Sequence, residues 1–165
     1  MSVNNFSIRP LKADEIPLLL QLIRELAEYE KMLDEVETTE ESLREALFGA
    51  YPCAEALLGC EDGVPVGYAV FFHNFSTFTG RRGLYLEDLY VRSPARGRGY
   101  GQMFLQRLAQ LALERNCGRL EWCVLDWNTT AIGFYKKIGA VPMDEWTTFR
   151  MSGDALQQLA HKGNG

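Results

Sequence analysis

Three alternating glycines lie in the middle of the chain, between an apolar segment and a segment with helical apolar spacing. The glycine loop is Arg96-Gly97-Arg98-Gly99-Tyr100-Gly101, which follows Leu84–Val91 and runs into Met103–Leu113. Glycines leave the neighbouring backbone N–H groups unshielded, and the start of a helix adds its own free N–H groups and the positive end of its dipole. The chemistry that this arrangement favours is the binding of a phosphate group.

Two acidic residues, Glu87 and Asp88, stand side by side within the apolar segment before the loop. Acidic side chains are rarely buried without a partner, so adjacent acids in such a segment are unusual. They predict either a functional pair of carboxylates or a structural feature, namely a bulge or a buried ion pair.

The elements that must position these residues form a series of strands and helices without repeats. Alternation and β-branched or aromatic content predict strands at Phe6–Arg9, Cys53–Cys60, Val66–Phe72, Leu84–Val91, Leu120–Leu125 and Trp146–Met151. Helices are predicted from Asp14 to Tyr29, after a capping box at Thr38 and Glu41, at Met103–Leu113, from Asn128 to about Ile138, and from Asp154. A tight hairpin at 61–65 accompanies the helices, so the sheet should be mixed rather than purely parallel.

Two nucleotide-binding motifs fit the glycine loop poorly. A P-loop consists of a glycine, four further residues and then Gly-Lys-Ser/Thr, whereas here Gly101 is followed by Gln102 and Met103. A dinucleotide fingerprint that starts at Gly97 would need glycine where Gln102 stands. The pattern Arg96-x-x-Gly99-x-Gly101 instead resembles the acyl-CoA pyrophosphate loop of the GNAT acetyltransferase superfamily.

A second motif, Asn128-x-x-Ala131-x-x-Phe134-Tyr135-x-x-x-Gly139-Ala140, resembles the other signature of that superfamily. The segments Leu84–Val91, Val124–Asn128 and Leu26–Glu30 are similar to the branch that contains diamine (spermidine/spermine) and thialysine N-acetyltransferases. The resemblance implies a single domain over 1–165. It also implies an α/β fold whose mixed, mostly antiparallel sheet is flanked by helices and splays at the acetyl-CoA site.

The resemblance further implies residue roles in the transfer of acetyl from acetyl-CoA to an amine. An alkylamine has a pKa near 10.4 and must lose a proton before it attacks the thioester, which requires a base. Glu87 would be that base, acting through water, and Tyr135 would donate a proton to the leaving thiolate. The implied acetyl-CoA contacts are Leu89, Tyr90, Val91, Arg96, Gly97, Arg98, Gly99, Tyr100, Gly101, Asn128 and Tyr135.

The acceptor amine is expected to meet acidic and aromatic side chains, which stabilise ammonium groups through charge and cation–π contacts. The resemblance implies that the substrate-binding residues are Glu30, Glu87, Asp88, Asp126, Trp127, Glu145 and Trp146. The segment Leu125-Asp126-Trp127-Asn128 is closer to the thialysine branch than to the polyamine branch, whereas Glu145-Trp146 lacks the glycine of the family pattern. A diamine, a polyamine and a lysine analogue such as thialysine therefore all stay open as substrates.

Composition narrows the range of partners. The 17 basic and 22 acidic side chains give a net charge of −5, which argues against a nucleic-acid track. The four cysteines form no CxxC motif and no apolar run is long enough to cross a membrane, so we expect a metal-free, cytoplasmic protein. A homodimer is expected from the resemblance alone. The alternatives are a protein N-terminal or lysine acetyltransferase and a non-enzymatic acyl-CoA-binding module.

Overall fold

The computed structural model describes residues 4–163, which fall into two compact units divided between Cys123 and Val124. The elements of the first unit are β1 (Phe6–Pro10), α1 (Ile16–Tyr29), α2 (Glu40–Phe48), β2 (Glu55–Glu61), β3 (Val64–Ser76), β4 (Arg81–Val91), α3 (Tyr100–Glu114) and β5 (Leu120–Trp122). Three short 3-10 turns accompany them at Ala13–Glu15, Leu33–Glu35 and Ser93–Ala95. The second unit contains α4 (Thr129–Lys137) and α5 (Gly153–Ala160).

The five strands form one sheet in the order β1-β2-β3-β4-β5. The first three pairings are antiparallel and β4 pairs with β5 in parallel, so the predicted mixed, mostly antiparallel sheet is confirmed. Asp62 and Gly63 both have positive φ, which lets a two-residue turn join β2 to β3. The parallel pair needs a longer crossover, and α3 supplies it.

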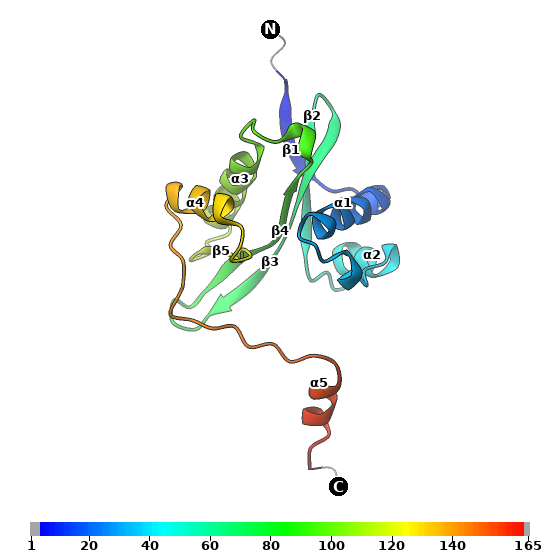
Figure 1. Cartoon of the computed structure of the whole chain (residues 1–165), viewed down its shortest axis with the longest axis vertical. Helices are drawn as coiled ribbons and strands as arrows, with labels where there is room; N and C mark the ends of the chain where they lie inside the picture. Colours follow the sequence, from blue (N-terminus) through cyan, green and yellow to red (C-terminus); the bar gives the residue numbers. More distant parts are fainter. Residues whose placement is uncertain (1–3, 164–165) are drawn as a thin grey trace. The chain divides into compact units, whose positions relative to one another are not determined.

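Helices α1 and α2 lie on one face of the sheet and α3 lies on the other (Figure 1). On the α1 face, Leu19, Leu22 and Leu26 recur at helical spacing and pack with Leu58 and Tyr68 in a buried cluster. On the α3 face, position 59 of β2 is a glycine that leaves room for the ring of Phe104, because a Cβ there would lie 2.6 Å from that ring. The sheet therefore has an apolar core on both faces.

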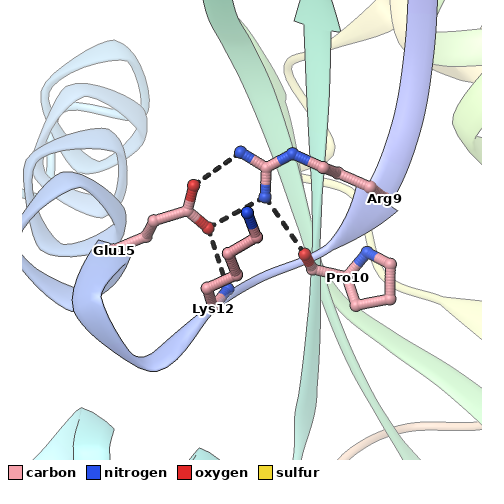
Figure 2. Close-up of polar contacts among 4 residues, drawn as sticks. All are labelled: Arg9, Pro10, Lys12 and Glu15. Carbon is pink, nitrogen blue, oxygen red and sulfur yellow. Dashed lines mark hydrogen bonds and ion pairs between the residues drawn. The ribbon is translucent and has the colours of Figure 1, made fainter.

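The link between β1 and α1 is fixed by a carboxylate that accepts several hydrogen bonds (Figure 2). Glu15 accepts from both terminal nitrogens of Arg9, at 2.9 and 2.5 Å, and from the backbone N–H of Lys12 at 2.8 Å. These bonds, those from Arg9 foremost, lower the pKa of Glu15 to about 2. The sequence placed the helix start at Asp14, but 13–15 form a 3-10 turn and α1 begins at Ile16.

Other element boundaries in the first unit also differ from the predicted ones, those of α2 and β5 among them. The capping box before α2 is formed by Thr39 and Ser42, one residue later than predicted, with reciprocal bonds of 3.0 and 3.1 Å. The last strand ends at Trp122 rather than Leu125, so β5 pairs only with residues 84–86 of β4. Beyond Leu86, β4 continues to Val91, and among the described residues no strand pairs with it on that side.

The second unit begins its first helix where the sequence predicted. Asn128 accepts a hydrogen bond of 3.3 Å from the N–H of Ala131 and caps α4, and Gly139 follows the helix with φ +98°. The predicted strand Trp146–Met151 is wrong, because 140–152 contain no strand. Trp146 and Phe149 are 75% and 93% exposed there. The terminal helix is confirmed, although it starts at Gly153.

Among residues 4–163, no helix has both the length and the apolar character that a membrane span requires.

Candidate active site

A β-bulge in β4 sets the position of the two adjacent acids. Val70 of β3 lies opposite Asp88, but the next pair is Phe71 with Leu86, so Glu87 is the extra residue. A bulge bends its strand and changes the direction of the side chains around it. Glu87 is exposed here while Asp88 is partly buried, and both structural and functional interpretations of this acidic pair are compatible with that geometry.

Asp88 accepts a hydrogen bond of 2.9 Å from the hydroxyl of Tyr68, a fully buried residue of β3. Burial raises the pKa of the Asp88 carboxyl, the bond from Tyr68 opposes this, and the charge of Glu87 adds to the rise. Burial and the Asp88 charge also raise the pKa of Tyr68. Sequence reasoning missed Tyr68, because an aromatic residue in an apolar strand is usually core.

Glu30 brings a third carboxyl group to this place. It follows the last residue of α1, is partly buried, and has its pKa raised first by burial and then by the charge of Asp88. Carboxyl groups held together out of water lose hydration, and a cation placed among them would restore favourable charge interactions. The structure therefore brings Glu30, Asp88 and Tyr68 together beside the bulge at Glu87, an arrangement suited to an ammonium group.

The open side of β4 offers backbone groups to a ligand. The N–H of Leu84 donates to Arg119 on the β5 side, whereas the N–H of Arg92 donates to Val66 on the β3 side. Because the bulge shifts the alternation by one residue, Leu89 and Val91 present their backbone to the side away from β3. The carbonyl of Val91 accepts a bond of 2.8 Å from Nε of Arg96. An extended amide-containing ligand could pair with the backbone of Leu89.

The glycine loop has the backbone conformation of an anion-binding loop. Gly97 and Gly99 have φ of +79° and +81°, which glycine adopts without strain, and Gly99 is the N-cap residue of α3. A Cβ built at Gly97, Gly99 or Gly101 would meet open space, and the first turn of α3 carries no acidic residue. Backbone N–H groups in such a loop, at the start of a helix, are suited to an anion such as phosphate.

The side chains of the loop are held by the surrounding protein. The guanidinium of Arg96 lies 4.5 Å from the ring centre of Tyr29 and 5.6 Å from that of Tyr90, which joins the loop to the end of α1. Arg98 and Tyr100 both bond to Glu61, the last residue of β2. Sequence reasoning missed Glu61, because its partners lie 37 and 39 residues away in the chain.

The remaining predicted residues belong to the second unit and are described there by themselves. Tyr135 lies on α4, is partly buried, and has its ring centre 5.7 Å from that of Phe134. Asp126, Trp127, Glu145 and Trp146 are exposed. Apart from the cap made by Asn128, the roles of these residues toward the first unit stay predictions.

Comparisons with known proteins show similarity to acetyltransferases over most of the chain. The acetyltransferase (GNAT) family model matches residues 19–140. Thialysine N-epsilon-acetyltransferase of Bos taurus is 41% identical and that of Sus scrofa 40%, each alignment covering 94% of this chain and 97% of the relative. Among solved structures, an integron cassette protein from the mobile metagenome of V. cholerae matches with a TM-score of 0.79 and 29% identity. That match covers 94% of this chain and 97% of the other.

Proposed function

The chain belongs to the GNAT acetyltransferase family, and from that premise we propose that it transfers acetyl from acetyl-CoA to a primary amine of a lysine analogue, diamine or polyamine. The observation that carries the choice of acceptor is the group formed by Glu30, Asp88 and Tyr68 at the bulge of β4. Its two partly buried carboxyl groups match an ammonium ion. The thialysine acetyltransferases, at about 40% identity, support the same class of acceptor.

Acetyl-CoA would bind as the donor substrate along the open side of β4 and in the glycine loop. The N–H groups around Gly97–Gly101 would hold the pyrophosphate, and the backbone of Leu89 would pair with the amides of the pantetheine arm. The family resemblance supports Asn128 and Tyr135 as further acetyl-CoA contacts. We accordingly propose that both units act as one acetyltransferase domain, since the family model spans 19–140 and thus crosses their boundary.

The reaction would proceed by direct attack in a ternary complex. The substrate ammonium gives one proton to Glu87 through water, and the freed lone pair attacks the acetyl carbonyl carbon. The new C–N bond forms, the C–S bond breaks, and the nitrogen loses its second proton to solvent. The CoA thiolate takes a proton from Tyr135, which solvent restores. Glu30 and Asp88 would hold the charged end of the substrate while these transfers occur.

We also propose that the protein is a cytoplasmic homodimer. Side chains that a partner could cover lie along 141–159, namely Val141, Met143, Trp146, Phe149, Met151, Leu156 and Leu159, which are 50% to 93% exposed. Light scattering across a range of concentrations should give twice the chain mass; the chain mass alone at every concentration would contradict the dimer. The four free thiols are compatible with a reducing compartment.

The experiment that tests the function is an assay of CoA release with acetyl-CoA and a panel of amines: putrescine, spermidine, spermine, lysine and thialysine. Turnover of at least one panel member, with the acetylated amine identified by mass spectrometry, is expected. Turnover of a peptide amine alone would favour a protein acetyltransferase, and CoA binding without any turnover would favour an acyl-CoA-binding module.

A further inference from the structure

Glu61 connects the end of β2 to the glycine loop and to the start of α3. Its carboxylate accepts from Nη1 of Arg98, at 2.5 and 2.6 Å to the two oxygens, and from the hydroxyl of Tyr100 at 2.5 Å. The hydrogen bonds from Tyr100 and Arg98 lower the pKa of Glu61, so the group is ionised at neutral pH. The Glu61 side chain is 17% exposed.

The two partners of Glu61 lie in the middle of the glycine loop and at the start of α3. Arg98 stands between Gly97 and Gly99, both in the left-handed region, where the chain has the greatest conformational freedom when it is not held. Tyr100 is the first residue of α3, and its ring also stacks on Phe6 of β1, with the centres 3.9 Å apart. One carboxylate thus fixes both the middle of the loop and the beginning of the helix.

The contacts of Glu61 with Arg98 affect whether Arg98 can contact acetyl-CoA directly. The resemblance placed Arg98 among the acetyl-CoA contacts, but its guanidinium is paired with Glu61 in this structure. Because Arg98 is paired, the anion-binding site would consist of the N–H groups around Gly97 and Gly99. The affinity of these groups for an anion depends on how well they are held in position before the anion binds. We infer that Glu61 is a positioning residue for acetyl-CoA binding, acting through Arg98 and Tyr100 on the pyrophosphate seat. This inference rests on the proposed function.

Binding of CoA to Glu61→Ala, measured by titration calorimetry, tests the inference. Loss of hydrogen bonds to a charged group should raise the Kd for CoA roughly tenfold. The KM for acetyl-CoA should rise in parallel, while kcat at saturating acetyl-CoA and the KM for the amine stay within about twofold of wild type. Arg98→Ala removes only one of the two contacts of Glu61 and should weaken CoA binding to a similar or smaller extent, and the double variant should be no weaker than Glu61→Ala, because the contact of Arg98 is already lost there.

A matched control lies at the other end of the same strand and helix. Glu55 begins β2 and pairs through both oxygens with Arg115, the C-cap residue of α3, at 2.5 and 2.9 Å. Glu55→Ala removes a comparable ion pair and should leave the Kd for CoA unchanged. An equal loss of CoA affinity in both variants would show a general effect on the fold and would overturn the inference.

The remaining outcomes also separate the possibilities. Unchanged or tighter CoA binding by Glu61→Ala would overturn the inference, and tighter binding would mean that Glu61 merely competes with phosphate for Arg98. If Glu61→Ala does not fold, Glu61→Gln decides in the same way, because it removes the charge and retains an acceptor for Tyr100. Failure of the wild-type protein to bind CoA would overturn the proposed function and this inference together. If the wild-type protein binds CoA and the Glu61 variant binds it equally well, only the inference is overturned.

Discussion

The hydroxyl of Tyr68 donates a hydrogen bond of 2.9 Å to the carboxylate of Asp88, at the point where a bulge interrupts the pairing of β3 and β4. Burial favours the neutral form of Asp88, and this bond favours the charged form. In the proposed function, the balance between the two effects determines whether Asp88 is charged when a cationic substrate binds. Tyr68 is fully buried and touches the proposed acceptor site through this bond to Asp88.

Tyr68→Phe removes that bond and leaves the ring in place. Because the bond lowers the pKa of Asp88, its loss should raise that pKa, so the carboxylate protonates at higher pH. The KM for the amine should increase several-fold near neutral pH and the acidic limb of kcat/KM should move to higher pH. Profiles of kcat/KM against pH for both proteins check this. An unchanged limb together with an unchanged KM would mean that the bond has no role in substrate binding.

Glu87→Gln removes the proposed base at the bulge. We expect kcat to fall by about 10²- to 10⁴-fold, because the carboxylate proposed to accept the proton of the substrate ammonium is then absent. The rising limb of the profile of kcat against pH, measured at saturating amine, should disappear with it. Asp88→Asn is the comparison, and it should act mainly on the KM for the amine. If the rising limb persists in Glu87→Gln and is lost in Asp88→Asn, the base is Asp88.

Tyr135→Phe removes the proposed proton donor from α4 and retains the ring. The thiolate then leaves without a proton, so kcat should fall by about 10²-fold, with little change in the Kd for acetyl-CoA. Steady-state rates and calorimetric binding, measured on the same preparation, separate the two effects. Unchanged turnover at saturating substrates would refute the assignment of Tyr135 as the acid.

Glu15→Gln should destabilise the junction between β1 and α1. The pKa of Glu15 is lowered to about 2 in the folded protein, below its ordinary value near 4.3, so its ion pair stabilises the fold above pH 4.3 and this contribution is lost as the pH falls toward 2. Solvent screening limits the effect at pH 7 to roughly 1 kcal/mol. Urea unfolding at pH 7 and at pH 3 measures it. A destabilisation that is the same at both values would exclude the charge as its cause.

The parts of the site that depend on local sequence could be predicted. The glycine loop, the cap at Asn128 and the turn at Gly139 follow from backbone preferences within a few residues, and the structure has them at the expected positions. The family resemblance drawn from these motifs is confirmed by the family model and by the thialysine acetyltransferases.

Contacts between distant segments could not be predicted in the same way. Tyr68 and Asp88 are 20 residues apart, and Glu61 and Arg98 are 37 apart, so their pairing depends on strand register. The segment Trp146–Met151 has the composition of a strand, but a strand also needs a partner for its backbone, and among the described residues it has none.

The central claim, acetyl transfer to a small cationic amine, is tested most directly by comparing kcat/KM for thialysine, spermidine and a lysine-containing peptide, with acetyl-CoA saturating. The carboxyl groups at Glu30 and Asp88 predict that a small amine exceeds the peptide by at least about tenfold, and that Asp88→Asn reduces this preference. Each CoA released should be matched by one acetylated amine. A higher kcat/KM for the peptide, or no acetylated product from either small amine, would contradict the account.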